Sequence, residues 1–202
     1  MPLLVILWYN NFMKFNKDIF EIIFLARGGQ GAKSAAEILA QAAVSEGKFV
    51  QAFPSFGPER SGAPTKTYLK VSSGEIRSHE PITDPDLVVV LDETLLADMG
   101  ITENLDRNEA LIINSPKSRE ELFLRFPDFK GTIYPIDANN ISAKIIGQPR
   151  PNTSILGKII KITSLVKLES VTFEFRRIFE SKIGKDATDK NVLAIEKAYD
   201  SL

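Results

Sequence analysis

The chain has 202 residues and a mass of 22.5 kDa, which is the size of one ordinary domain. Its 25 Lys and Arg residues against 26 Asp and Glu residues lack the basic excess of a general nucleic-acid or acidic-membrane binder. The absence of cysteine excludes disulfides, thiolate zinc sites, nucleophilic thiols and cysteine-held iron–sulfur clusters. A single histidine, His79, also excludes a metal site with two histidine ligands.

Residues 1–17 form an N-terminal extension ahead of one predicted domain over residues 18–202. The apolar run 3–9 is far shorter than the roughly 20 residues that span a bilayer. The first lysine, Lys14, follows this run, whereas a secretory signal has its basic residues in front. We therefore expect no membrane contact and a cytoplasmic location, with Met13 as an alternative start.

A strand–turn–helix–strand unit opens the domain. Residues 18–26 are apolar and β-branched, as in a buried strand, and the glycine-rich segment 27–31 ends that pattern. Residues 32–46 are rich in strong helix formers with apolar positions at helical spacing, and Gly47 stands where a helix cap belongs. With a strand at 49–53, these residues predict a βαβ unit.

The rest of the chain alternates strands with helices before it becomes helical. Beyond the proline-rich loop 54–64, strands are predicted at 65–71, 86–91, 111–114 and 132–137, and helices at 153–166, 170–180 and 190–199. This order predicts an α/β protein with a Rossmann-like, open, mostly parallel sheet and a helical C-terminal tail. The segment Pro149–Pro151 resembles a hinge between sheet and tail.

The glycine turn is the first candidate site. Gly28, Gly29 and Gly31 lie between a strand and a helix N-terminus, where free N–H groups and the helix dipole favour an anion such as phosphate, and Lys33 adds positive charge. The spacing matches neither dinucleotide nor P-loop motifs, and no acidic residue between Glu46 and Glu59 is available for a ribose, so NAD is disfavoured. The alternative is a tight turn with no ligand.

Three polar residues outside the turn have two interpretations each. Arg60 on the proline-rich loop either reaches an anion or is a solvated charge, and His79 is more typical of a structural residue than of a catalyst. Asp92 follows a buried strand, where α/β sheets place ligands, but aspartate also favours the N-cap of a helix. No nucleophile–base pair, carboxylate pair or metal cluster is recognisable, so no catalytic residue is assigned.

Four collinear segments resemble the γ subunit of pyruvate:ferredoxin oxidoreductase and related 2-oxoacid:acceptor oxidoreductases. They are ARGGQGAKSAAEILAQAA (26–43), AFPSFGPERSGAPTKTYLKVS (52–72), IRSHEPITDPDLVVVLDETLL (76–96) and PRPNTSILGKI (149–159). The resemblance extends from about residue 20 to residue 199. The FPSFGPERSGAP segment is closer to the pyruvate and branched-chain (ketoisovalerate) members than to the oxoglutarate or indolepyruvate members, and assigns 18–202 as a pyruvate/ketoisovalerate oxidoreductase γ domain.

The resemblance implies an oxidoreductase of anaerobic metabolism that is active only as a complex. Such enzymes decarboxylate a 2-oxoacid on thiamine diphosphate with Mg²⁺, pass electrons through [4Fe–4S] clusters to ferredoxin, and transfer the acyl group to coenzyme A. The implied partners are the α, β and ferredoxin-like δ subunits of a heterotetramer, which hold these cofactors, while the γ subunit helps to close the coenzyme A site. The lack of cysteine in this chain agrees with that division.

The resemblance also assigns site residues. The family's glycine turn is Gly28, Gly29, Gln30 and Gly31, and Arg60 belongs to its Gly-Pro-Glu-Arg loop. The family usually has glycine where this chain has Ala26, which makes the backbone there less permissive. Three interpretations stay open: a subunit that helps to hold coenzyme A for a pyruvate or a ketoisovalerate enzyme, a subunit for assembly only, and a free-standing nucleotide-binding enzyme.

Overall fold

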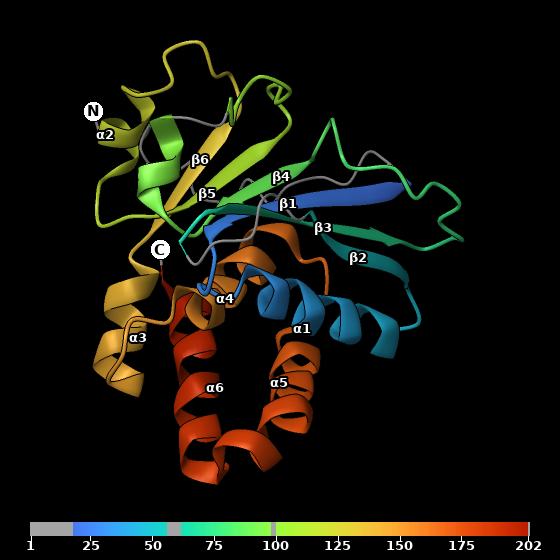
Figure 1. Ribbon diagram of the computed structural model, residues 1–202, viewed down its shortest axis with the longest axis vertical. Coiled ribbons are helices and arrows are strands. Elements are labelled where there is room, and N and C mark those ends of the chain that lie inside the picture. The colour runs from blue at the N-terminus through green and yellow to red at the C-terminus, as the bar shows by residue number, and fades with distance from the viewer. Residues whose placement is uncertain (1–17, 56–61, 98–99, 202) are drawn as a thin grey trace, which may run out of the picture.

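The structure is a computed structural model that describes residues 18–55, 62–97 and 100–201. These residues form one six-stranded sheet with the spatial order β2-β3-β1-β4-β5-β6 (Figure 1). The strands are β1 (Ile19–Arg27), β2 (Phe49–Ser55), β3 (Pro64–Ser72), β4 (Leu87–Val90), β5 (Ala110–Asn114) and β6 (Thr132–Ile136).

The sheet is mixed, because one of its six strands runs in the opposite direction to the others. Strands β1, β4, β5 and β6 are parallel to one another, whereas β3 runs antiparallel to both of its neighbours, β1 and β2. Strand β2 therefore runs in the same direction as β1, which confirms a mostly parallel, open sheet. Strand β2 ends and β3 begins at the carboxyl edge of the parallel strands.

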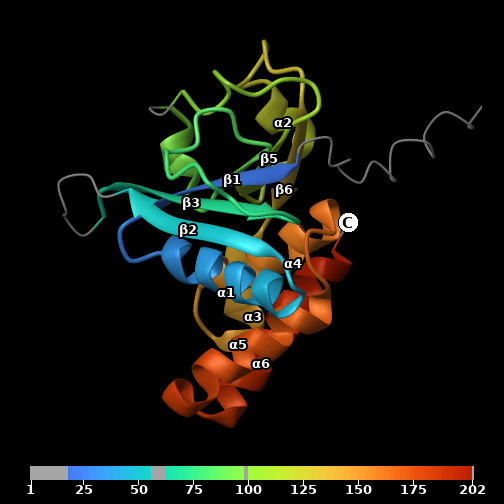
Figure 2. The same cartoon turned by 90° about the vertical axis from the view of Figure 1, so that its right-hand side faces the viewer.

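The helices are divided unequally between the two faces of the sheet. One face carries α1 (Ala32–Ser45), α3 (Ala138–Ile146), α4 (Pro151–Thr163), α5 (Leu168–Ile183) and α6 (Lys185–Asp200). The opposite face carries only short elements, among them the 3-10 helix η2 (Glu93–Ala97) and α2 (Arg119–Phe123). Figure 2 shows the sheet edge-on between these two layers.

Alternation along β1 supplies both hydrophobic cores. Phe20, Ile22 and Phe24 point to the α1 and α4 side, while Ile23 and Leu25 pack against the side chains of the other face. The residues of β4 and β5 are all buried, as expected for central parallel strands that are covered on both faces. The sequence of α1 fits its position, since eight of its residues, six of them alanines, are buried and let the helix approach the sheet closely.

The helical C-terminal region is part of the main core. Ile155, Leu156 and Ile159 of α4 are fully buried together with the side chains of β1 and α1. The segment 149–151 leads directly into α4, whose first residue is Pro151, a position that proline favours. The predicted hinge is therefore wrong, because α4 covers the sheet instead of following it as an appendage.

Three further observations complete the fold. The predicted extension at residues 1–17 lies outside the described residues. No helix in the described part of the chain is long and apolar enough to cross a membrane.

Ala26 is fully buried in β1, and only Ser164 among the described non-glycine residues has a positive φ, so the alanine places no strain on the strand.

Candidate functional site

The candidate site lies at the carboxyl edge of the sheet, between β1 and β4. The chain leaves β1 through the glycine turn and α1 towards β2 on one side, while β4 lies on the other side of β1. The strand order therefore reverses between these two strands, and open α/β sheets bind ligands at such a point. The turn at Gly28–Gly31 and the segment after β4 that begins at Leu91 meet here.

Some N–H groups of the glycine turn donate hydrogen bonds within the protein, and others do not. Gly29 has a φ of 95° and Gly31 a φ of 82°, a conformation that favours glycine. The Gly28 N–H donates to the Ala63 carbonyl at 2.8 Å, and the Gln30 N–H donates to the Arg27 carbonyl at 3.1 Å. Both groups are thus satisfied within the protein.

The remaining amides are available to a ligand. No described residue accepts a hydrogen bond from the N–H groups of Gly29, Gly31, Ala32, Lys33 or Ser34. Gly31 stands at the N-cap of α1, where a glycine offers no side-chain cap, and the first turn of α1 has no acidic residue. A helix N-terminus of this kind attracts negative charge.

The N-terminus of a second helix packs against this turn. A Cβ at Gly31 would lie 2.6 Å from Nδ2 of Asn152, in the first turn of α4, so a larger residue at this position would require that side chain to move. At Gly29 a Cβ would meet nothing within 4 Å, which leaves open space beside the turn. The geometry thus fixes one side of the turn against α4.

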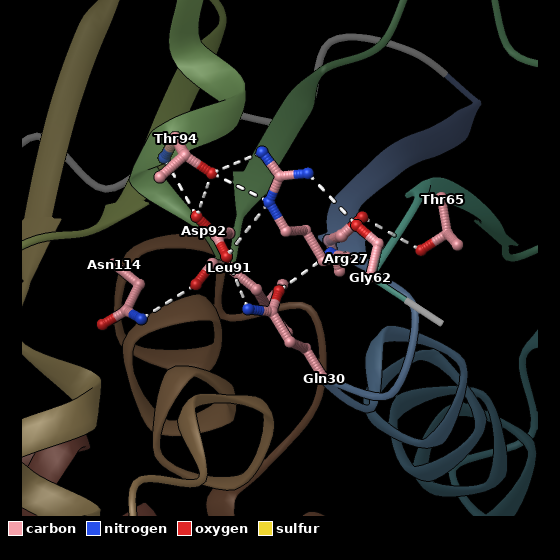
Figure 3. Close-up of polar contacts among 9 residues, drawn as sticks. Arg27, Gln30, Gly62, Thr65, Leu91, Asp92, Thr94 and Asn114 are labelled. Carbon is pink, nitrogen blue, oxygen red and sulfur yellow. Dashed lines mark hydrogen bonds and ion pairs between the residues drawn. The ribbon is translucent and has the colours of Figure 1, made fainter. Parts of the chain in front are cut away.

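Gln30 connects the ends of β1 and β4 (Figure 3). Its Oε1 accepts from the Arg27 N–H at 2.8 Å, and its Nε2 donates to Oδ2 of Asp92 at 2.6 Å. The side chain that sequence reasoning assigned to a ligand is therefore engaged within the protein. Its role in this structure is to hold the turn against β4.

Asp92 is both at the strand end and at a helix start, so its two sequence-based interpretations coincide. Its Oδ1 accepts from the Thr94 N–H at 3.0 Å and from Oγ1 of Thr94 at 2.6 Å, which caps η2. Burial alone would raise the pKa of this carboxyl, but the hydrogen bonds from Thr94 and Gln30 and the charge of Arg27 hold the pKa below its ordinary value. Asp92 is thus a carboxylate at neutral pH.

Arg27 is the polar residue at the centre of this edge, and sequence reasoning did not single it out. Its Nε and Nη2 donate to Oγ1 of Thr94 at 2.9 and 2.7 Å, and its Nη1 donates to the Gly62 carbonyl at 3.1 Å (Figure 3). Its Nε also lies 3.6 Å from Oδ2 of Asp92. The signal in the sequence was its place as the last residue of a buried strand, directly before the glycine turn.

The residues directly ahead of β3 contact the glycine turn. Gly62 and Ala63 precede β3, and they bond to both the N–H and the carbonyl of Gly28, at 2.8 and 3.4 Å. Arg60 lies outside the described residues, so the structure gives no position for its side chain. Its loop nevertheless starts and ends at the edge that carries the glycine turn.

A second carboxylate follows Asp92. Glu93 binds the ammonium of Lys117, lies 3.7 Å from Nη1 of Arg125, and accepts a hydrogen bond from Ser115 Oγ at 2.8 Å. Burial would raise the pKa of Glu93, but Lys117 and Ser115, followed by the charge of Arg125, hold it below its ordinary value. These contacts occupy both of its oxygens.

An open pocket at the opposite edge of the sheet has an acidic lining that does not suit a phosphate. It has a volume of about 500 Å³ and is lined by Thr83, Asp84, Glu103, Asn104, Leu105 and Asp106. Three acidic side chains repel an anion. His79 is exposed in the connection from β3 to β4, which starts and ends at this amino edge, and so it lies away from the glycine turn. In the described ranges no group of three or more His, Asp or Glu side chains is placed to hold a metal ion.

Comparisons with known proteins agree with one another. The family model described as pyruvate ferredoxin/flavodoxin oxidoreductase matches residues 21–201. The common γ subunit of the pyruvate/ketoisovalerate oxidoreductases of Thermococcus kodakarensis is 44% identical over 181 residues, which cover 90% of this chain and 96% of that protein. Pyruvate synthase subunit PorC of Thermotoga maritima is 38% identical over 187 residues, covering 92% and 96%.

Solved structures confirm the fold. The crystal structure of the pyruvate oxidoreductase subunit PORC of Thermotoga maritima superposes with a TM-score of 0.82 at 36% identity, covering 92% of this chain and 97% of that chain. The 2-oxoglutarate:ferredoxin oxidoreductase of Magnetococcus marinus contains the same fold within a longer polypeptide, with a TM-score of 0.74 over 30% of that chain. By sequence and by fold, this chain belongs to the pyruvate ferredoxin/flavodoxin oxidoreductase family.

Proposed function

We propose that this chain is the γ subunit of a pyruvate:ferredoxin oxidoreductase and that its carboxyl edge forms part of the coenzyme A site. The complex decarboxylates pyruvate with thiamine diphosphate, forms acetyl-coenzyme A and reduces ferredoxin. The observation that carries the coenzyme A assignment is the glycine turn, whose free amides at Gly29 and Gly31–Ser34 adjoin a guanidinium at Arg27. Coenzyme A is the substrate of this reaction that carries phosphates.

The chain contributes binding groups, and its partners contribute the redox chemistry. Thiamine diphosphate with Mg²⁺ and the [4Fe–4S] clusters belong to the α, β and δ subunits, because a chain without cysteine offers no thiolate for an ordinary cluster. The described residues of this chain bind and orient: the amides and Arg27 face the ligand, while Gln30 and Asp92 hold the edge in shape. No covalent step is assigned to them.

Exposed apolar side chains support docking onto partner subunits. Phe173, Ile183 and Leu193 lie exposed on α5 and α6, which project away from the sheet (Figure 1). Leu124, which follows α2, is 83% exposed. A contiguous apolar surface formed by such side chains would favour a protein interface, so we infer that α5 and α6 are candidates for docking.

A second candidate is a shared subunit that serves both a pyruvate and a ketoisovalerate enzyme. The relative from Thermococcus kodakarensis is named as a common subunit of two such enzymes. The residues that would choose the oxoacid belong to other chains in this scheme, so one γ subunit can serve both. Purification of the chain from its native source, followed by assays with pyruvate and with 2-ketoisovalerate, separates a dedicated subunit from a shared one.

Hydrogen exchange of the purified complex tests the coenzyme A assignment. With saturating coenzyme A, we expect slower exchange in peptides that cover residues 28–34 and 56–63, and unchanged exchange in α5 and α6. If coenzyme A binds the complex and leaves both peptides unchanged, the chain serves assembly only. Turnover of pyruvate by the isolated chain would contradict the division of roles.

Substitution of Arg60 adds a kinetic test. Hydrogen bonds to charged groups contribute about 1.5–3 kcal/mol, so Arg60→Ala is expected to raise the KM for coenzyme A about 10- to 150-fold. Arg77→Ala is the matched control, because Arg77 on the opposite edge is 86% exposed and forms an exposed ion pair with Glu75. An unchanged KM in Arg60→Ala would remove Arg60 from the site.

A further inference from the structure

Arg27 makes several hydrogen bonds within the protein and still has N–H groups that no described residue accepts from. A guanidinium carries five N–H groups. Three of them are used, two on Thr94 Oγ1 and one on the Gly62 carbonyl, which leaves one N–H on each terminal nitrogen without an acceptor among the described residues. The side chain is 34% exposed, so part of it is open to solvent.

Asp92 orients Arg27 without occupying its free donors. The oxygens of Asp92 already accept three hydrogen bonds, from Gln30 Nε2 and from the hydroxyl and amide of Thr94. Its approach to Arg27 is 3.6 Å, through Nε, which is already bonded to Thr94. The Asp92 side chain is 18% exposed and the Arg27 side chain 34%, so the cation is the more exposed member of the pair.

Arg27 also joins the three segments that form the edge. It ends β1, it bonds to Thr94 on η2, and it bonds to Gly62 ahead of β3 (Figure 3). A planar guanidinium with two free terminal N–H groups suits the oxygens of a phosphate. Gln30 cannot serve in the same way in this arrangement, since both ends of its amide are bonded within the protein.

We propose that Arg27 is the side chain of the glycine turn that binds a phosphate of the adenosine part of coenzyme A, and that Thr94 is a positioning residue that aims it. This inference rests on the proposed coenzyme A site. It assigns the anion contact to a residue in the described edge, independently of Arg60. Gln30 is a positioning residue as well, because it holds the turn through Asp92.

The test compares fragments of coenzyme A in the assembled enzyme. Adenosine 3′,5′-bisphosphate carries phosphates and no thiol arm, whereas pantetheine carries the arm and no phosphate. In Arg27→Gln we expect the KM for coenzyme A and the inhibition constant of the bisphosphate each to rise about tenfold or more, with kcat and the inhibition constant of pantetheine unchanged. Thr94→Val keeps the charge but loses its anchor, so its bisphosphate constant should rise by a smaller factor.

Two controls keep the test decisive. Arg77→Gln removes an exposed arginine at the opposite edge and should change neither constant. Arg27→Lys keeps the charge without the fork and should recover part of the bisphosphate affinity, and it replaces Arg27→Gln as the test variant if that protein does not assemble. A bisphosphate that fails to inhibit the wild type, or constants for both fragments that rise together, would overturn the proposal.

Hydrogen exchange separates this inference from the proposed function. Slower exchange at residues 28–34 with coenzyme A, together with an unchanged bisphosphate constant in Arg27→Gln, would overturn the role of Arg27 alone. Unchanged exchange at those residues in the wild type would overturn the coenzyme A site itself.

Discussion

Asp92 links two strands that are adjacent in the sheet and distant in the sequence, and its ionised form stabilises the fold. Because its pKa is lowered in the folded chain, its contribution is complete above the ordinary value of 3.8 and is lost as the pH falls through the folded pKa. We expect Asp92→Asn to lower the free energy of unfolding at pH 7 by about 1–3 kcal/mol.

Urea unfolding of the purified chain at pH 7, 5 and 3 measures this effect. The difference between the wild type and Asp92→Asn should shrink as the pH falls below 3.8. Asp186→Asn is the control, because its carboxylate on α6 is 83% exposed and an exposed ion pair contributes little. A difference that stays constant down to pH 3 would contradict the ionised role of Asp92.

Lys158 on α4 is a buried cation whose surroundings favour its neutral form. Burial lowers its pKa, and the charges of Arg119 and Lys161 lower it further. The folded chain therefore binds fewer protons than the unfolded chain between that lowered pKa and 10.5, and wild-type stability should rise with pH across this window.

Lys158→Met removes the buried charge and keeps much of the side-chain volume. We expect a variant that is at least as stable as the wild type at pH 7, by up to about 2 kcal/mol, with less gain between pH 7 and pH 10. Thermal unfolding at both pH values checks this, with the exposed Lys197→Met as control. Destabilisation at pH 7 would show that the contact of Lys158 with the Ser201 carbonyl matters more than its burial.

At the scale of elements, the contact between α4 and α6 depends on one glycine. A Cβ at Gly157 would lie 2.0 Å from the Ile195 carbonyl oxygen and 2.6 Å from the Tyr199 nitrogen, both of them backbone atoms of α6. Gly157→Ala must therefore move the helices apart, and we expect a loss of about 2–4 kcal/mol.

Gly74→Ala is the matched control for that substitution. A Cβ there meets nothing within 4 Å, and its φ lies outside the positive region, so stability should change by less than about 0.5 kcal/mol. Denaturant midpoints of the two variants provide the comparison. Equal midpoints would mean that α4 and α6 are less closely packed than the structure shows.

Sequence patterns predicted the elements well and their contacts less well. Apolar runs and the glycine turn predicted β1, α1 and β2 nearly to the residue, because local composition determines strand and helix. Alternation along residues 65–71 predicted a strand, but periodicity does not tell direction, so the antiparallel β3 went unforeseen. In the site, Gly28–Gly31 were predicted from local sequence, whereas the contact of Arg27 with Thr94 spans 67 residues and depends on β4 lying beside β1.

For the whole molecule, we expect the helical region after residue 150 to be required for folding. Its helix α4 contributes Ile155, Leu156 and Ile159 to the core beneath the sheet, and α6 packs on α4. A chain truncated after Arg150 leaves one face of the sheet largely uncovered. We expect no cooperative thermal transition in circular dichroism and no stable fragment on limited proteolysis.

Co-expression of the truncated chain with the missing helices complements that experiment. Residues 151–202 supplied as a second polypeptide should restore a cooperative transition, since the missing contacts are side-chain packing and not a covalent requirement. A truncated chain that melts cooperatively alone would restore the idea of a separable tail.

The reversed direction of β3 has a consequence for how recognition can vary. Because β3 begins at the carboxyl edge, the residues that lead into it, Gly62 and Ala63, lie directly beside the glycine turn. Connecting segments tolerate changes of length and composition better than the strands they join, so the residues between β2 and β3 are a place where related enzymes can differ on a constant framework. Grafting the residues between β2 and β3 from one relative into another would test whether this segment tunes ligand preference on an unchanged scaffold.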